Sequence, residues 1–261
     1  MSSTSLIQRK LKDDDFQLNV SRGLIPGFEN LARFGRNGVI NTATTPEAVW
    51  ETGGVYTGQP IHSAPAEVIQ LVSDNINDAS PAGTGARLVR VTGLNELWEY
   101  TTEIIAMNGT TPVTTVSLWR RVWLAEVLTA GSTGGNVGTI TCNNTPTVAN
   151  VFLSILPQHN ASQAGVYTVP ENKMLFAQTL HIQIARAGGT PGSADYSLRV
   201  RAEGSVFQAA RYNSVTTSYV DFFESTSMPI PARTDIKAVC ESVSDNSTIM
   251  SVRLSGVLVD V

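Results

Sequence analysis

Apolar and polar residues alternate along most of the chain from about residue 67 onward. In the segment Arg87–Thr92, Val89 and Val91 lie on one face of an extended chain and the polar residues lie on the other. A period of two residues predicts β-strands that are buried on one side. The predicted strands are Glu67–Val72, Arg87–Thr92, Trp98–Met107, one or two strands within Val113–Leu128, Thr139–Cys142, Val148–Leu156, Met174–Ala185, Tyr196–Ala202, Val206–Tyr212, Val215–Phe223, Ile236–Val243 and Met250–Val259.

Turn residues separate these segments at short intervals. Asn108-Gly109 is a hairpin signal, the glycine-rich segment Ala130–Gly138 predicts a flexible hairpin end, and Pro229-Ile230-Pro231 predicts a strand end. Closely spaced strands with intervening turns favour a sandwich or barrel. We therefore predict an all-β fold of two consecutive antiparallel β-sandwich modules, jelly-roll or Ig-like, over residues 46–157 and 158–261.

The first 45 residues lack a clean period. They include aromatic and aliphatic residues in a number that is unusual for a solvated tail, so we predict an extended N-terminal arm over residues 1–45 that becomes ordered on a partner chain. A frayed terminus is the alternative. The predicted interface residues of this arm are Phe16, Leu24, Ile25, Phe28, Leu31, Phe34 and Arg36.

A single helical turn is expected directly after the arm. Thr45 can cap it, Pro46 suits its first position, and Glu47 complements the helix dipole. Gly53-Gly54 would end it.

Composition narrows the range of functions. The 261 residues carry a formal net charge of -4, and 15% of them are charged, against roughly 25% in ordinary domains. This balance argues against nucleic-acid or membrane-surface binding. No apolar run long enough for a transmembrane helix and no secretory signal is visible. Cys142 and Cys240 are interpreted as buried thiols.

Patterns that could support catalysis or metal binding fail on spacing. His62, His159 and His181 have no second ligand at metal-binding spacing; the first two are expected in exposed loops and the third on a strand. Glu99 and Glu103 would lie about 13–14 Å apart on one strand, too far for most glycosidase pairs. No nucleophile-elbow motif is present. We predict no enzymatic activity, no catalytic residue, no cofactor and no metal.

Three further motifs have ordinary interpretations. The glycines of 131–138 lack the Lys and the helix of a phosphate-binding loop, and Asp13–Asp15 lacks the spaced ligands of a calcium loop. Trp119, Arg121 and Trp123 share a strand face; a nucleic-acid platform is possible there, but core packing or a protein interface is favoured.

Several short motifs, in order, resemble a family of tailed-phage virion structural proteins of the capsid decoration type. They cover roughly residues 34–261 and are Phe34–Asn37, Thr45–Tyr56, Gly83–Arg87, Asn108–Val113 and Val166–Pro170. The resemblance implies a β-rich particle component and carries over no catalytic residues.

The expected function is a capsid decoration (cement) subunit on the virion surface, made in the host cytoplasm. It would form a homo-oligomer, most plausibly a trimer, bound to the major capsid protein or another virion protein, without nucleic acid or membrane. A tail, baseplate or fibre-base component is the alternative. A carbohydrate-binding attachment module is a second alternative, and its candidate aromatic residues are Trp119, Trp123, Tyr196, Tyr212 and Tyr219.

Overall fold

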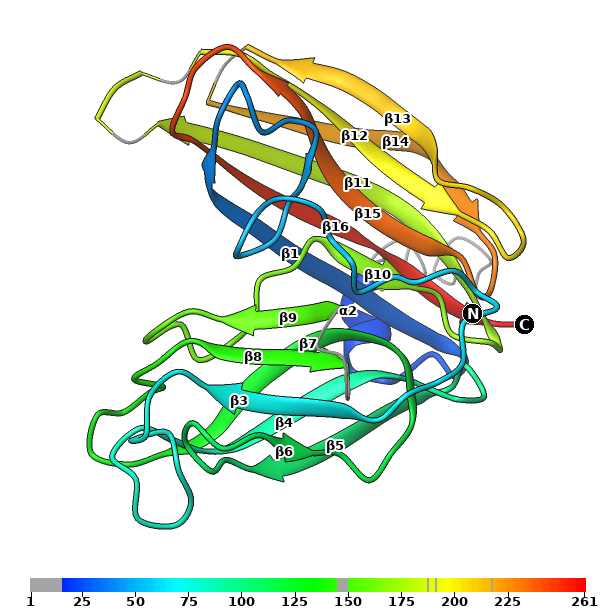
Figure 1. Ribbon diagram of the computed structural model, residues 1–261. Helices are drawn as coiled ribbons and strands as arrows, with labels where there is room; N and C mark the ends of the chain where they lie inside the picture. Colours follow the sequence, from blue (N-terminus) through cyan, green and yellow to red (C-terminus); the bar gives the residue numbers. More distant parts are fainter. Residues whose placement is uncertain (1–15, 145–149, 187, 191, 217) are drawn as a thin grey trace, which may run out of the picture.

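The computed structural model describes residues 16–144, 150–186, 188–190, 192–216 and 218–261, without the side chains of 219–226. Within these residues the chain forms one helix, α2 (Phe16–Ser21), and sixteen strands in four antiparallel sheets (Figure 1). The strands are β1 (Phe28–Ile40), β2 (Glu47–Ala48), β3 (Ile69–Ser73), β4 (Ala86–Asn95), β5 (Tyr100–Ala106), β6 (Val113–Thr114), β7 (Trp119–Ala130), β8 (Ile140–Asn144), β9 (Val151–Ile155), β10 (Val166–Thr168), β11 (Lys173–Arg186), β12 (Ala194–Arg201), β13 (Gln208–Val215), β14 (Tyr219–Ile230), β15 (Asp235–Val243) and β16 (Thr248–Asp260).

The larger sandwich consists of two sheets with strand orders β1-β16-β11-β14 and β10-β15-β12-β13, and β2 pairs with β15 beside β10. Its pairs are nested along the chain: β1 with β16, β10 with β15, β11 with β14, and β12 with β13. This nesting is a long antiparallel ribbon rolled into two sheets, which is the jelly-roll topology. The predicted all-β sandwich fold is therefore confirmed.

The smaller sandwich contains the sheets β6-β3-β8-β9 and β5-β4-β7. Its strands lie between β2 and β10 in the sequence, so it is an insertion within the jelly roll (Figure 1). The chain leaves and re-enters the jelly roll at one place, where the Gly165 amide donates to the Val49 carbonyl at 2.8 Å. A Cβ at Gly35 would lie 2.2 Å from the Gly165 nitrogen, so this crossing requires glycine.

The prediction of an extended arm is wrong for residues 28–40, because β1 pairs along its length with β16. The hydrophobic pattern did not predict this strand, because its inward-facing positions include Arg33, Gly35 and Asn37 as well as apolar residues. The helix α2 packs beside β1, with the Phe16 ring against Phe28 at 5.6 Å. Of the predicted arm, residues 1–15 lie outside the described residues.

The single helical turn predicted after the arm is also wrong: Glu47 and Ala48 form β2. The carboxylate of Glu47 accepts hydrogen bonds from the Asn37 amide at 2.9 Å and from the Gly54 backbone at 2.7 Å. These bonds hold the segment as a strand folded back by Gly53, whose φ is 66°. The hydrogen bonds of the Glu47 side chain therefore outweigh the local helix-capping signal of the sequence.

The Asn108-Gly109 signal does not close a hairpin. The strand before it, β5, pairs with β4, and the strand after it, β6, pairs with β3. The segment connects one sheet of the smaller sandwich to the other, and the Gly109 amide donates to the Asp78 carbonyl at 2.7 Å. A turn is present at this position as predicted, but it joins strands of two different sheets.

The glycine-rich segment Ala130–Gly138 is held by one buried carboxylate rather than free. Asp78 is fully buried, and its oxygens accept from the amides of Ala86 at 2.7 Å, Val137 at 2.9 Å and Gly138 at 2.8 Å. Three backbone donors on one side chain tie Val137 and Gly138 to the start of β4. The predicted hairpin end is wrong, because the strands on either side of this segment, β7 and β8, belong to different sheets.

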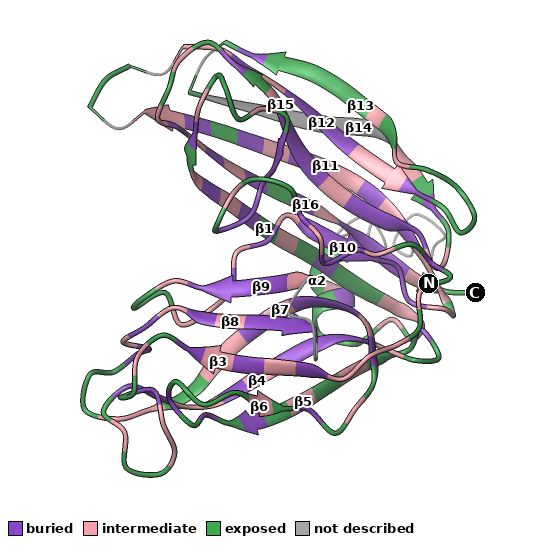
Figure 2. Ribbon diagram, in the orientation of Figure 1, coloured by how far each residue is buried: buried purple, intermediate pink, exposed green. Residues whose placement is uncertain are grey.

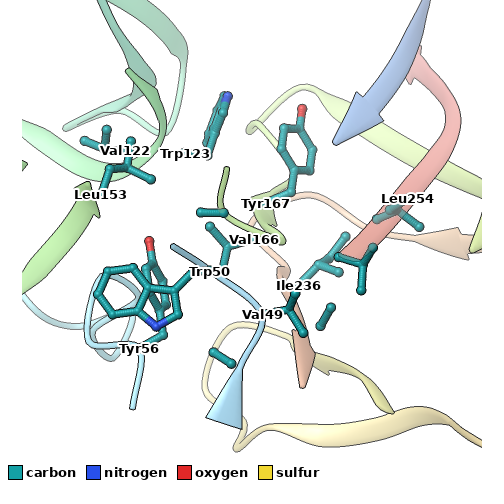
Figure 3. Close-up of a cluster of buried hydrophobic side chains, with 14 of the residues drawn as sticks. Val49, Trp50, Tyr56, Val122, Trp123, Leu153, Val166, Tyr167, Ile236 and Leu254 are labelled. Carbon is teal, nitrogen blue, oxygen red and sulfur yellow. The ribbon is translucent and has the colours of Figure 1, made fainter. Parts of the chain in front are cut away.

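One continuous cluster of buried apolar side chains extends through both sandwiches. Figure 3 shows Trp123 and Leu153 of the smaller sandwich in the same cluster as Tyr167 and Ile236 of the larger one. The Trp123 and Tyr167 rings lie 4.8 Å apart. The shared core makes the two sandwiches one packed body (Figure 2).

Candidate functional site: the junction and the exposed N-terminal surface

A buried ionic cluster joins the two sandwiches. Asp235, at the start of β15, has no exposed surface. Its carboxylate accepts hydrogen bonds from Arg121 of β7 at 2.7 and 3.0 Å and from Arg201 of β12 at 2.5 and 3.0 Å. Thr168 of β10 donates to it at 2.6 Å. These residues, with His62, are called the junction cluster below.

The arginines of the junction cluster also hold the loop that leads into the insertion. Arg121 and Arg201 donate to the Pro60 carbonyl at 2.9 and 2.7 Å, and Arg201 donates to the Gln59 carbonyl at 2.9 Å. Burial alone would raise the pKa of Asp235, but the hydrogen bonds and charge of Arg121 hold it below its ordinary value. Asp235 is therefore a charged, fully coordinated bridge between the sandwiches.

His62 belongs to this cluster, contrary to its predicted exposure. Only 8% of the residue is exposed; its Nε2 lies 2.6 Å from the Arg233 carbonyl oxygen and 3.5 Å from the Asp235 carboxylate. The ring stacks on Trp98 at 5.4 Å, and burial lowers its pKa. Because the His62 ring is packed against Trp98 and lies beside the arginines of the cluster, its role is structural. His159 is exposed and His181 lies on β11, both as predicted.

Glu51 is a second buried acid in the loop between β2 and β3. It is 8% exposed, and both carboxylate oxygens are buried without a hydrogen-bond partner. Burial raises its pKa to about 8, with Arg33 partly opposing the shift. The Arg33 Nε and the Trp50 Nε1 are also buried without partners. Burial therefore favours the protonated form of Glu51 in the folded protein.

The predicted interface residues separate into exposed, buried and partly buried groups. Phe16, Leu24 and Phe34 are exposed by 43%, 65% and 55%, whereas Leu31 is 8% exposed and faces the core. Leu31 is therefore wrong as an interface residue, because alternate residues of β1 point into the jelly roll. The remaining three are partly buried: Ile25, Phe28 and Arg36.

Three apolar residues near the start of the chain are each more than half exposed, and together they are called the N-terminal surface residues below: Leu24, Phe34 and Val39. Val39, which sequence reasoning missed, is 61% exposed. The Phe34 ring stacks with the Arg253 guanidinium of β16 at 5.2 Å, so it is held in place on the sheet. Figure 2 shows exposed stretches along β1.

The aromatic candidates for glycan or nucleic-acid binding are mostly internal. Trp119, Trp123 and Tyr196 are exposed by only 1%, 3% and 2%. Tyr212 is 59% exposed, and the side chain of Tyr219 lies outside the described ones. Of the two favoured interpretations, core packing or a protein interface, the structure shows core packing for Trp119 and Trp123, and Arg121 between them is also buried.

The other sequence candidates have structural roles or none. Glu103 accepts from the amides of Val116 and Ser117 at 2.8 and 2.9 Å, which fixes a loop. Cys142 and Cys240 are free and buried, as predicted. No group of His, Cys, Asp or Glu that could hold a metal is found among the described residues, and none of their helices has the length and apolarity to cross a membrane.

Comparisons with known proteins show only weak structural similarity. No protein-family model matches the chain, and no curated protein matches it. A protein of the cowpea mosaic virus empty virus-like particle has 9% identity and a TM-score of 0.23, covering 74% of this chain and 83% of that chain. A protein of infectious bursal disease virus, Gt strain, has 11% identity and a TM-score of 0.26, covering 94% and 78%. Such low similarity supports no argument about function.

Proposed function

We propose that the protein is a non-enzymatic structural subunit of a virus particle, a capsid decoration (cement) subunit that oligomerises on the major capsid shell. The observation that carries the proposal is the exposure of the N-terminal surface residues, since Leu24, Phe34 and Val39 are each more than half exposed close to one another in sequence. If these side chains are contiguous on the surface, they form the kind of exposed apolar patch that marks protein–protein contacts.

Two further features support an assembly role. The larger sandwich is a jelly roll, an architecture used in viral capsid and lectin domains, and the motif order resembles phage virion proteins. A lectin would present its aromatic residues to solvent, whereas Trp119 and Trp123 are buried. The fold alone does not determine function, so the surface residues provide the test.

The test is incorporation of a surface variant into particles. Leu24→Asp combined with Phe34→Asp places negative charge at two of the N-terminal surface residues. We expect incorporation to fall by about tenfold or more, with little change in the melting temperature. Val116→Asp is the matched control, since Val116 is 92% exposed on the smaller sandwich. Normal incorporation of the double variant would contradict the proposal. A deletion of residues 1–35 is unsuitable because it removes much of β1.

Copy number distinguishes the decoration subunit from a tail, baseplate or fibre-base component. A subunit spread over the head would approach the abundance of the major shell protein, whereas a tail component would be far scarcer. Solution mass then tests the proposed homotrimer. Binding on a glycan array would instead favour an attachment module, with Tyr212 as its exposed candidate.

A further inference from the structure

Lys237 lies in the middle of β15 without a carboxylate partner. It stands between Ile236 and Ala238, which are buried in the jelly-roll core, so its own side chain points to the outer face of the sheet. Its Nζ lies 3.9 Å from the centre of the Phe207 ring, which belongs to the loop between β12 and β13. Within the described part of the chain, the Lys237 ammonium forms no ion pair and no hydrogen bond. An aromatic ring takes the place of a counter-ion.

The acids on the same face of β15 are already bonded to arginines. Asp235 accepts from Arg121 and Arg201 in the junction cluster. Glu241 accepts from the Nε of Arg199 at 2.9 Å and from its Nη2 at 2.8 and 2.6 Å. Three arginines and two carboxylates leave one net positive charge beside the lysine. A further ammonium at this place is therefore poorly compensated.

The surroundings of Lys237 favour its neutral amine. Burial lowers the pKa of Lys237 to about 8, Arg199 and Arg201 lower it further, and Asp235 and Glu241 oppose the shift less strongly. Arg199 is the direct cross-strand partner of the lysine, and the Arg201 guanidinium lies 4.4 Å from the centre of the same phenyl ring. A lysine that is desolvated beside other cations is a nucleophile, because its amine is neutral near physiological pH.

Lys173 is the contrasting lysine of the jelly roll. Its Nζ lies 2.8 Å from the Glu29 carboxylate and 2.5 Å from the Asp260 carboxylate. Burial alone would lower the pKa of Lys173, but the hydrogen bonds to these two acids raise it. Lys173 is therefore held as an ammonium ion and provides an internal control.

The arginines beside Lys237 keep donors for a new anion. Among the described residues, no acceptor is bonded to the Nη1 of Arg199 or of Arg201. Neither nitrogen is sealed from solvent without a partner. Guanidinium groups form strong, charge-assisted hydrogen bonds with carboxylate oxygens. A product at Lys237 that carries a carboxylate group thus fits this place better than the ammonium or a neutral amide.

We propose that the Lys237 amine takes up carbon dioxide as a carbamate, whose negative charge is stabilised by Arg199 and Arg201. The nitrogen lone pair attacks the carbon of CO2, a C–N bond forms, and the electron pair of one C=O π bond moves to oxygen. The nitrogen then gives its proton to water. The net charge of the lysine with the three arginines and two acids changes from two positive charges to none. The proposal does not depend on the function proposed above.

Carbon-13 NMR of the full-length protein in labelled bicarbonate tests the proposal. At a pH of about 8, where about half of the Lys237 amines are neutral, we expect a carbamate carbonyl resonance. It should be lost in Lys237→Arg and retained in Lys173→Arg, the matched control. Any α-amino group also forms carbamates, so the readout is the difference between wild type and Lys237→Arg. A spectrum that is the same in these two proteins would overturn the proposal.

A second variant tests the role of the arginines. Arg199→Gln should reduce the carbamate signal by about threefold or more, since it removes a positive charge beside the carbamate. Arg90→Gln, in the smaller sandwich, is the matched control and should leave the signal unchanged. An equal signal in Arg199→Gln and wild type would contradict stabilisation of the carbamate by Arg199.

Competitive acetylation measures the reactivity of the amine itself. With a limiting amount of acetic anhydride at neutral pH, mass spectrometry should find Lys237 acetylated about tenfold or more faster than Lys173, because each unit of pKa changes the neutral fraction about tenfold. A lysine that only packs on Phe207 would react no faster than Lys173. That result would overturn the assignment of Lys237 as a reactive amine.

Discussion

Asp235 and Glu51 are both buried acids near the contact between the sandwiches, yet they differ in charge state. Asp235 accepts hydrogen bonds from Arg121, Arg201 and Thr168, and its pKa lies below the ordinary value. Glu51 has no hydrogen-bond partner for either oxygen, and burial raises its pKa to about 8. Burial is common to both, so the available donors decide whether a buried acid stays ionised. Asp235 couples the two sandwiches, whereas Glu51 weakens the fold at high pH.

The largest effect is expected from removing the satisfied acid. Asp235→Ala leaves Arg121 and Arg201 buried without their counter-charge, which should lower the free energy of unfolding by about 3–5 kcal/mol. Urea denaturation measures it. Arg90→Ala is the control, because the Arg90 side chain is 43% exposed in its pair with Glu126 and solvent-exposed ion pairs contribute little to stability. Equal losses in the two variants would remove the distinction between the acids.

The next effect concerns the unsatisfied acid. The folded-state pKa of Glu51 is raised from 4.5 to about 8, so the unfolded chain releases a proton that the folded chain retains between these values. Stability should therefore fall as pH rises from 4.5 to 8. Glu51→Gln should reduce this fall and raise the free energy of unfolding at pH 8 by about 1–3 kcal/mol relative to wild type. Parallel pH profiles for the two proteins would contradict this assignment.

His62 should act in the opposite direction. Burial lowers its pKa below 6.5 in the folded protein, so the unfolded chain binds a proton that the folded chain excludes. Stability is present above pH 6.5 and decreases as the pH falls below it. His62→Gln removes the titrating group, so between pH 7 and pH 5 the variant should lose less free energy of unfolding than wild type, as measured by urea denaturation at each pH. An equal loss in the variant would assign the acid sensitivity to another group.

The smallest effect compares two buried tyrosines. The Tyr56 hydroxyl donates to the Phe152 carbonyl at 2.9 Å, whereas the buried Tyr196 hydroxyl has no partner. Tyr56→Phe should cost about 1 kcal/mol, and Tyr196→Phe should be neutral or slightly stabilising. Thermal or urea unfolding of both variants checks the difference, and a larger loss for Tyr196→Phe would contradict it.

Local alternation predicted the strands well where one face is purely apolar. Val89 and Val91 are both fully buried on β4, as the pattern requires. The method failed for β1, where Arg33 and Asn37 occupy inward positions and their partners belong to other segments of the chain, 90 and 10 positions away. Arg33 donates to the Trp123 carbonyl, and Asn37 donates to Glu47. A period of two cannot identify inward polar residues that are satisfied by tertiary contacts.

The junction cluster was beyond sequence reasoning for a related cause. Arg121 and Asp235 are separated by 114 positions, and no spacing rule connects them. Arg121 was considered only as part of an aromatic-basic strand face, and His62 only as an exposed loop residue. Recognising the cluster requires the insertion of one sandwich within the other, and that arrangement depends on strand pairing across the whole chain.

The pairing of β1 with β16 has a consequence for synthesis. The smaller sandwich has all its strands by residue 155, so its contacts can form while the rest of the chain is still being made. The strand β1 must wait for residues 248–260, which are synthesised after all the other described strands. The jelly roll therefore closes only after β16 has been made, and a chain that stops before β16 cannot present a finished jelly roll for assembly.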